Sequence, residues 1–395
     1  MSRPELALAS ALPLLAAVAY LTPAAAAAKP PDTGIVRGPY LQQTRSTSTY
    51  VVWQTERPMA GAVHYGIRSA GERVRSAPSR RRMHAIQLRG LSPATSYRYR
   101  VSAGRRTTGA FRFRTAKVGA VPFRFGVIGD YGSGKPPAYR NAALLRREDV
   151  DFILTTGDNV YPSGLDRQYD RGLFGPFGVL MRRAPMWPTL GNHDYGDEGT
   201  PPRRRADAYF RNFVLPHEPG RERFYSFRYG NAEFLAIDDE VTSFAPASRQ
   251  YRWIDATLRR SRACWTIPYF HHPAHAEYVN PTAGDLEKLR HVQRWLLPLF
   301  ERHGVKLVLT AHQHNYVRSR RLLGGRADRR GVTYVIAGGG GAALEPLPPT
   351  PSPFTAVRGR FFHHLLVTVA GRALRVRAID TSGRVRDRFR LSCRG

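Results

Sequence analysis

Five short polar stretches of this chain carry side chains that bind metal ions. They span residues 129–132, 157–161, 191–194, 271–273 and 311–314. Together they offer carboxylates, a phenol, an amide oxygen and several imidazoles, a donor set suited to holding two metal ions. One such stretch would be weak evidence, because Gly-Asp and Asn-His pairs occur in ordinary turns. All five in this order, after strand-like runs, favour a dinuclear metal site.

The runs that precede these stretches are short, mostly apolar and typical of buried strands. Asp130, Asp158, His271 and His312 follow the runs at residues 123–128, 152–155, 266–270 and 306–309. A single Asp after a strand is more often a turn residue or a helix cap. In open α/β sheets, however, binding sites are assembled at the carboxyl ends of the strands. The repeated placement therefore favours a site over a set of unrelated turns.

The same part of the chain alternates strand-like runs with amphipathic stretches. Further runs cover residues 234–237, 332–336, 362–369 and 374–379. The stretch 248–262 begins with Ser248 at an N-cap position, and the stretch 283–303 has one apolar side, so both are predicted helices. This alternation predicts an α/β domain over residues 123–395.

Residues 36–115 differ in character, because short alternating strands follow one another and no helical stretch intervenes. The clearest strand-like runs are residues 49–54, 61–66 and 96–101. About eighty residues of this kind predict a small β-sandwich. Residues 91–99 (Leu-Ser-Pro-Ala-Thr-Ser-Tyr-Arg-Tyr) are typical of a fibronectin type III-like module. We place this domain at residues 33–117, before a linker that ends at residue 122.

The N-terminus has the pattern of a secretion signal. One arginine and an apolar run at residues 6–21 precede a small-residue stretch at 24–28 that offers an Ala-x-Ala cleavage site. We predict a signal peptide at residues 1–28; the alternative is an uncleaved membrane anchor. No later segment approaches the roughly eighteen apolar residues of a spanning helix. We expect a secreted or periplasmic protein with no membrane span after cleavage.

The formal net charge of +31 does not by itself indicate a nucleic-acid-binding protein. Of the 61 basic residues only five are lysines, at positions 29, 117, 135, 288 and 306. The arginines are spread over the whole chain and form no single stripe with interleaved aromatic residues. We therefore expect no specific nucleic-acid partner, although the charge should steer small anionic substrates toward the protein.

The chain has two cysteines, Cys264 and Cys393, which lie far apart in the sequence. In an exported protein they could form one disulfide bond. Two buried free thiols are the alternative, and the sequence does not choose between them.

The motifs resemble those of the purple acid phosphatase family, within the metallophosphoesterase superfamily and its calcineurin-like fold. The resemblance extends from about residue 36 to the C-terminus, because the opening Gly38-Pro39-Tyr40-Leu41-Gln42 is typical of the family's N-terminal domain. It implies a metallophosphoesterase αββα sandwich, an α/β fold, preceded by the small β-sandwich.

The resemblance also implies the two ligand sets. One metal would be held by Asp130, Asp158, Tyr161 and His314. The other would be held by Asn192, His271 and His312, with Asp158 bridging the two. His193 falls on the position that contacts the phosphate and helps to protonate the leaving group.

Some details depart from the family pattern. Ala311 replaces the usual Gly before the last His-x-His. The doublet His271-His272 leaves a choice of ligand. We choose His271, because the family pattern of a ligand, any residue and then Pro or Ala fits His271-His272-Pro273. No histidine stands at the usual distance for a second catalytic role. His275 is the only nearby candidate, and an ordinary surface histidine is the alternative. The run of glycines at 338–341 resembles a loop that approaches the metals, or is a plain flexible turn.

Tyr161 bears on the identity of the metals. A free phenol has a pKa of about 10 and ligates as a phenolate only beside a strongly charged ion. This favours Fe(III) at its site and Fe, Zn or Mn as the divalent partner; the alternative is a packing aromatic residue before Pro162.

The resemblance implies a secreted acid phosphatase that hydrolyses phosphomonoesters by attack of a metal-bound hydroxide at an Fe(III)–M(II) centre. A phosphodiesterase or nucleotide pyrophosphatase on the same scaffold is the first alternative, because the dinuclear site does not choose the ester. A non-catalytic surface-binding protein is a remote one, since every expected ligand position is filled. The expected partner is a small phosphate ester, and the oligomeric state is left open.

Overall fold

The computed structural model of the chain describes residues 34–196, 206–216 and 223–393. The predicted signal peptide at residues 1–28 lies outside these ranges. Among the described residues, no helix is both long enough and apolar enough to cross a membrane.

The N-terminal strands form two antiparallel sheets. One contains β1 (Ile35–Gln42), β2 (Ser48–Met59) and β5 (Arg81–Arg89). The other contains β4 (Arg73–Ser76), β3 (Gly61–Gly66), β6 (Ser96–Ala103), β7 (Arg106–Thr107) and β8 (Phe111–Arg114). Burial alternates along β6, and Trp53, Tyr99 and Val101 are fully buried in the core of this region. The small β-sandwich is thus confirmed, whereas its fibronectin type III likeness and the boundaries 33–117 and 123–395 stay predictions.

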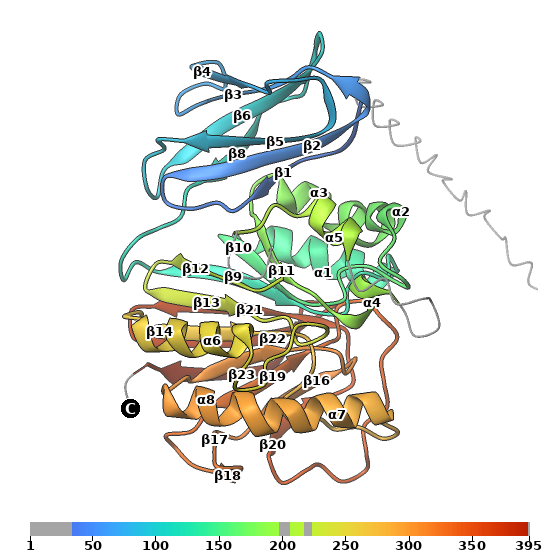
Figure 1. Cartoon of the computed structure of the whole chain (residues 1–395), viewed down its shortest axis with the longest axis vertical. Helices are drawn as coiled ribbons and strands as arrows, with labels where there is room; N and C mark the ends of the chain where they lie inside the picture. Colours follow the sequence, from blue (N-terminus) through green and yellow to red (C-terminus); the bar gives the residue numbers. More distant parts are fainter. Residues whose placement is uncertain (1–33, 197–205, 217–222, 394–395) are drawn as a thin grey trace, which may run out of the picture. The chain divides into compact units, whose positions relative to one another are not determined.

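Two mixed sheets make up the rest of the fold (Figure 1). The first has the strand order β11 (Met186–Thr189), β10 (Phe152–Thr156), β9 (Phe123–Ile128), β21 (His363–Ala370), β22 (Ala373–Asp380), β23 (Val385–Ser392). The second has the order β12 (Tyr225–Tyr229), β13 (Ala232–Ala236), β14 (Trp265–Tyr269), β15 (Leu307–Thr310), β19 (Thr333–Ala337), β16 (Tyr316–Ser319), β20 (Thr355–Gly359). The strands β10, β13, β15 and β19 are buried along their whole length, as expected where both faces of a sheet are covered.

Helices cover the outer faces of the two sheets (Figure 1). On the side of the first sheet lie α1 (Pro136–Arg147) and α3 (Gly175–Met181); on the side of the second lie α6 (Arg249–Arg260), α7 (Ala283–His291) and α8 (Leu297–Arg302). The shorter elements are α2 (Asp166–Tyr169), α4 (Asn192–Tyr195), α5 (Asp207–Asn212), the π-helical turns η1 (Asp170–Phe174) and η2 (Val292–Leu296), and the β17 (Leu322–Leu323) and β18 (Arg326–Ala327) pair. The αββα sandwich is confirmed.

Most predicted elements are present, with ends that move by one or two residues, except that β2 continues five residues beyond the predicted run at 49–54. The strand at 123–128 is β9 itself, and the helix predicted from Ser248 is α6, where the Ser248 Oγ accepts a hydrogen bond from the Tyr251 N–H (3.2 Å). The stretch 283–303 is helical but contains the π-helical turn η2. The sequence patterns did not predict α1, β11 or β23. β11 is four residues long and contains a proline, and β23 carries charged residues on its exposed face.

The β-sandwich is joined to the α/β part by polar contacts that are buried or partly buried. The Arg37 guanidinium, from β1, donates from Nη1 to Asp166 Oδ1 (3.0 Å) and from Nη2 to Asp170 Oδ2 (2.9 Å). The Tyr40 hydroxyl donates to the Asn212 carbonyl (2.8 Å), and the Tyr99 hydroxyl donates to a carbonyl in the turn after α3 (2.7 Å). The Arg37 contacts tie β1 to the segment that contains α2 and η1, and the two tyrosines tie β1 and β6 to α5 and to the turn after α3.

Cys264 and Cys393 form a disulfide bond, with their Cα atoms 5.6 Å apart. Cys264 immediately precedes β14 of the second sheet, and Cys393 immediately follows β23, the edge strand of the first. The bridge therefore connects the two sheets, and of the two alternatives the structure contains the disulfide.

Candidate metal centre

The polar stretches meet at the carboxyl ends of five strands drawn from both sheets. Strands β9, β10 and β11 are adjacent and parallel, as are β14 and β15. The stretches that carry Asp130, Asp158 and Tyr161, Asn192, His271, and His312 and His314 follow these strands in that order. The prediction that strand ends assemble the site is confirmed at the level of the elements. The structure brings seven proposed ligands and His193 together.

One group of ligand atoms surrounds the Tyr161 hydroxyl. It lies 3.3 Å from Asp130 Oδ1 and 3.3 Å from His314 Nε2, and those two atoms lie 3.5 Å apart. A ligand atom of Asp158 belongs to the same cluster, in which the Asp130, Asp158 and His314 atoms all lie within 4.8 Å of one another. This is the set that the resemblance assigns to the first metal.

A second group of ligand atoms surrounds the Nε2 atom of His271. It lies 3.0 Å from Asn192 Oδ1, 3.2 Å from His312 Nδ1 and 3.4 Å from Asp158 Oδ1. Because Asp158 belongs to both groups, its carboxylate occupies the bridging position that the resemblance implies. The His271 side chain is fully buried, so that it contributes to this group without contact to bulk water.

The outer nitrogens of the three histidines are all occupied. His271 Nδ1–H donates to the Thr156 carbonyl (2.8 Å), His314 Nδ1–H to the Ala343 carbonyl (2.9 Å), and His312 Nε2–H to Asp285 Oδ1 (2.8 Å). In a neutral imidazole the other nitrogen is then an acceptor, and this acceptor is the atom that faces the cluster. When both rings are neutral, as they are in metal-binding histidines, the lone pairs of His271 Nε2 and His312 Nδ1 face each other across 3.2 Å, and a cation beside them would accept both. The donor set thus fits metal ions, and such outer partners are usual for metal-binding histidines.

Three of the proposed ligands have strained backbone conformations. Asp130 (φ 53°), Asp158 (φ 53°) and His312 (φ 66°) lie in the left-handed region, which is uncommon for residues other than glycine. Such strain is often found at functional sites, where surrounding contacts maintain it. Beside them, a Cβ on Gly191 would lie 2.3 Å from Asp158 Oδ1, so that only glycine allows the chain to pass this close to the bridging carboxylate.

The electrostatics of the cluster depend on burial. Burial, together with the charges of Asp158 and Asp130, raises the pKa of the Tyr161 phenol far above its ordinary value. Burial alone would raise the pKa of Asp158, but the charges of His271 and His193 outweigh it and lower this pKa to about 2. Without a cation, Tyr161 is therefore a neutral donor beside the ionised Asp158, and a strongly charged ion is required to displace its proton.

His193 lies at the rim of the cluster. Its Nδ1–H donates to the Pro162 carbonyl (2.6 Å), its ring packs on Tyr161 with centroids 4.3 Å apart, and its Nε2 lies 3.8 Å from Asp158 Oδ2. The His193 backbone N–H also donates to Asp158 Oδ1 (3.1 Å). A cleft of about 420 Å³ opens here, lined among others by His193, Asn192, His312 and Tyr278.

The structure does not bring His275 into this cluster. Its ring packs against Tyr334 and Phe354, with centroids 5.0 and 4.8 Å away, and burial lowers its pKa to about 4. These contacts give no support to a catalytic role for His275. The side chain is half-buried between these rings, which also differs from the alternative of an ordinary surface histidine.

Sequence patterns missed several carboxylates that support the ligands. Asp239 accepts the backbone N–H groups of His271 (3.1 Å) and His272 (2.8 Å), and Asp285 holds His312. Asp194, which follows His193 directly, accepts from the backbone of Asn159 and Gly191. Burial and the charge of Asp158 raise the pKa of Asp194 to about 7. Asp285 had a readable signal, because Thr-x-x-Asp at 282–285 is a capping box.

The glycine run at 338–341 does approach the site. The Gly340 N–H donates to the Gly129 carbonyl (3.0 Å), and the Ala342 N–H donates to the Asp130 carbonyl (2.8 Å). Of the two alternatives, the loop that approaches the metal ligands is the one the structure contains.

Comparisons with known proteins indicate the family and the fold. Residues 123–316 match the calcineurin-like phosphoesterase family, and residues 36–115 match the purple acid phosphatase N-terminal domain. Human acid phosphatase type 7 is 28% identical over 362 residues, covering 79% of this chain and 79% of that protein. Purple acid phosphatase 21 of Arabidopsis thaliana is 27% identical over 297 residues, covering 72% of this chain and 64% of that protein. The solved structure of purple acid phosphatase PPD1 from yellow lupin seeds has the same fold, with a TM-score of 0.77, 19% identity and coverage of 90% of this chain and 74% of that one.

Proposed function

Because the chain belongs to the purple acid phosphatase family, it is a metal-dependent phosphoesterase, and we propose that it is a secreted acid phosphatase selective for phosphomonoesters. One observation supports this most strongly. The inner nitrogens His271 Nε2 and His312 Nδ1 lie 3.2 Å apart beside Asp158, and both outer nitrogens are already bonded, so that in the neutral rings two lone pairs converge on one point. This arrangement suits a metal pair and has no evident use in a non-catalytic binding protein.

We assign one ion to Asp130, Asp158, Tyr161 and His314, and the other to Asn192, His271, His312 and Asp158. Tyr161 favours Fe(III) at the first position, and the second suits Fe, Zn or Mn in the divalent state. When bound, the two ions polarise the phosphoryl oxygens and acidify a water molecule, which is the usual contribution of a dinuclear site to phosphate ester hydrolysis.

His193 is the proposed proton donor. Hydrolysis forms a bond from a water oxygen to phosphorus and breaks the ester P–O bond, so the departing alkoxide must gain a proton. The Pro162 carbonyl fixes His193 Nδ1–H, which leaves Nε2 as the ring nitrogen available to the cleft. A positioned proton donor of this kind contributes about 10²–10⁴-fold to the rate.

The preference for monoesters is supported by charge. A monoester dianion benefits more than a singly charged diester from the steering field of a chain with a net charge of +31. The secretion signal pattern before residue 29 and the disulfide between Cys264 and Cys393 support export to an oxidising compartment.

The test is a substrate panel combined with elemental analysis of the purified protein. We expect stoichiometric iron with a divalent partner, and a higher kcat/KM for an aryl monophosphate than for the bis-aryl phosphate. Faster cleavage of the bis-aryl phosphate would transfer the chain to the diesterase alternative. Full activity in metal-depleted His312→Ala protein would remove the two-metal hypothesis altogether.

A further inference from the structure

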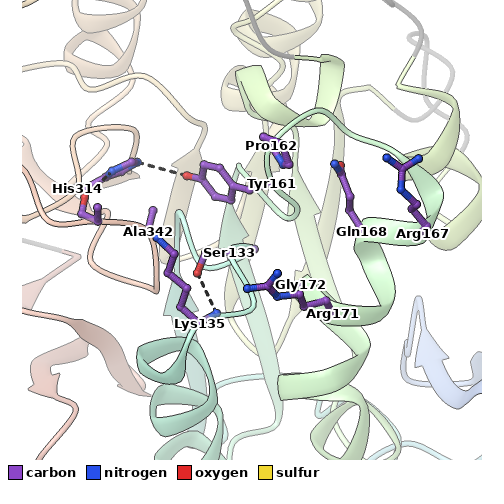
Figure 2. Close-up of a pocket in the computed structure, with 12 residues that line it drawn as sticks. Ser133, Lys135, Tyr161, Pro162, Arg167, Gln168, Arg171, Gly172, His314 and Ala342 are labelled. Carbon is purple, nitrogen blue, oxygen red and sulfur yellow. Dashed lines mark hydrogen bonds between the residues drawn. The ribbon is translucent and has the colours of Figure 1, made fainter.

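A second cavity adjoins Tyr161 and shares His314 with the cleft that His193 lines. It has a volume of about 560 Å³ and is bounded by Tyr161 and His314, by the loop before α1, and by α2 and η1 (Figure 2). Since Tyr161 and His314 are also proposed ligands of the first metal, the cavity adjoins the reaction centre directly. Its size is within the range of small-molecule sites in proteins.

Three cationic side chains line this cavity. Lys135 comes from the residue before α1, and Arg167 and Arg171 come one helical turn apart from α2 and η1. Figure 2 shows Lys135 and Arg171 on its walls below Tyr161, with Arg167 farther from the metal ligands. Within the described ranges, none of the three side chains has an ion-pair partner among the salt bridges of the chain.

The acidic neighbours of these arginines are engaged elsewhere. Asp166 and Asp170 directly precede Arg167 and Arg171, and in solution each could neutralise the arginine beside it. In the folded chain both carboxylates instead accept from Arg37 of the β-sandwich, at 3.0 and 2.9 Å. The fold thus pairs Asp166 and Asp170 with Arg37, whereas Arg167 and Arg171 line the cavity with their positive charges.

The cavity wall is also ordered by specific contacts. Arg171 packs against Gly134, where a Cβ would lie 2.3 Å from the Arg171 Cγ, so the glycine makes room for this arginine. Ser133 Oγ donates to the Gly341 carbonyl (2.8 Å) and accepts from the Lys135 N–H (3.2 Å), which fixes the loop that carries Lys135. The first turn of α1, a twelve-residue helix, contains no acidic residue.

We propose that this cavity is a second anion subsite, which binds a distal phosphate of a substrate while the reacting phosphate lies at the metal pair. The inference rests on the proposed phosphatase function and names its substrate class: phosphomonoesters that carry a second phosphate group. Lys135 and Arg171 provide the principal contacts, and Arg167 adds charge at the outer end. Cations that form no ion pair within the protein bind phosphate without first breaking one.

The experiment compares α,ω-alkanediol bisphosphates, from ethanediol to octanediol, with alkyl monophosphates of the same chain lengths. The readout is the ratio of kcat/KM for each bisphosphate to that of its monophosphate, corrected for the two equivalent reactive groups. We expect the ratio to exceed one and to pass through a maximum at the length that spans the two sites. Arg171→Gln and Lys135→Gln should each lower that maximum roughly tenfold, as expected for the loss of one charge-assisted contact.

Two variants serve as controls. Arg171→Lys keeps the charge and should retain most of the preference, and Arg140→Gln removes another exposed arginine, on α1, that does not line the cavity. Calorimetric binding of the matching bisphosphonates and monophosphonates, which are not hydrolysed, gives a second readout that does not depend on turnover. A bisphosphonate preference that Arg171→Gln abolishes supports the subsite even if the esterase assay fails.

Each contrary result has one meaning. Equal ratios in wild type, Arg171→Gln and Arg140→Gln, with monoesterase activity present, would overturn the subsite and leave the phosphatase function standing. A similar fall in Arg140→Gln would reduce the effect to general charge steering and also overturn it. Absence of all phosphatase activity in the metal-loaded wild type would contradict the proposed function, and the phosphonate binding would then decide the subsite separately.

Discussion

Each histidine of the cluster is oriented by the group behind it. A backbone carbonyl orients His271 and another orients His314, whereas a carboxylate, Asp285, orients His312. A carboxylate partner makes an imidazole a stronger ligand than a carbonyl partner does. Of the second set of proposed ligands, His312 is therefore the one whose bond to the metal should be most easily weakened by a substitution outside the ligands.

Asp285→Asn should weaken the second metal site without removing a ligand. We expect affinity for the divalent ion to fall by about 10–100-fold, the usual effect of losing an outer-shell carboxylate. Chelator competition measures this affinity. Asp255→Asn is the matched control, because Asp255 holds His303 in an equally short contact (2.8 Å) on α6, away from the cluster. Equal metal affinity in wild type and Asp285→Asn would show that Asp285 has no role in the site.

Tyr161→Phe should abolish the colour of the iron-loaded protein. A phenolate bound to Fe(III) transfers charge to the metal and absorbs visible light, whereas phenylalanine cannot bind. The raised pKa of the Tyr161 phenol means that iron itself must displace its proton, so the band should appear only on iron loading. Absorption spectra of both proteins, with Tyr139→Phe as an exposed control, provide the measurement. Stoichiometric iron in a colourless wild type would remove Tyr161 from the ligands.

At the scale of elements, a capping box positions an active-site group. The Thr282 Oγ accepts from the Asp285 N–H (3.1 Å) and donates to Asp285 Oδ2 (2.8 Å), while Asp285 Oδ1 accepts from His312. The start of α7 therefore fixes the carboxylate that orients His312, a proposed ligand, so that helix stability and metal affinity should be linked through the Asp285 side chain.

Thr282→Ala should affect both properties. Loss of the cap should lower the free energy of unfolding by about 0.5–2 kcal/mol. Metal affinity should fall too, but less than in Asp285→Asn, since the carboxylate itself remains. Ser248→Ala, which removes the corresponding cap of α6, should destabilise the protein similarly and leave metal affinity unchanged. A loss of metal affinity in Ser248→Ala as large as in Thr282→Ala would mean that destabilisation alone accounts for the effect.

The residues that the sequence proposed as ligands lie together in the structure, whereas several elements around them were not predicted. The ligand motifs are short and follow buried strands, so that the sequence changes sharply from apolar to polar at Asp130, Asp158 and His271. The apolar runs of these strands also predict the layered fold. β23 was missed because it alternates Arg386, Arg388 and Arg390 with half-buried residues at the edge of a sheet. The contacts of Asp239 and the packing of His275 depend on long-range tertiary structure, which local patterns do not record.

At the scale of the whole molecule, Arg37 links the β-sandwich to the reaction centre's surroundings. Its side chain is only 5% exposed and it contacts Asp166, Asp170 and Asn212. Burial alone would raise the pKa of Asp166, but hydrogen bonds from Arg37 and Asn212 outweigh burial and lower it. Folding therefore stabilises the ionised form of Asp166 through Arg37 of the β-sandwich.

Arg37→Met should lower stability in a pH-dependent way. We expect a loss of about 1.5–3 kcal/mol near neutral pH, the range for hydrogen bonds to charged groups. The folded pKa of Asp166 lies below its unfolded value of about 3.9, so its contribution is fully present above that pH and is lost as the pH falls through the folded pKa. Urea unfolding of wild type and variant across this range should give a gap that narrows on acidification.

Arg228→Met provides the comparison for this last test, because Arg228 pairs with Glu233 at 3.2 Å while its own side chain is 59% exposed. Exposed pairs contribute about 0–1 kcal/mol, so the loss should be small at every pH. A gap in stability between wild type and Arg37→Met that stays constant or widens as the pH falls would show that the charge of Asp166 does not stabilise the junction.

Arg37→Met also frees Asp166 and Asp170 to pair with Arg167 and Arg171. If the distal-phosphate subsite depends on that separation of charge, Arg37→Met should also lower the bisphosphate preference, although Arg37 does not line the cavity.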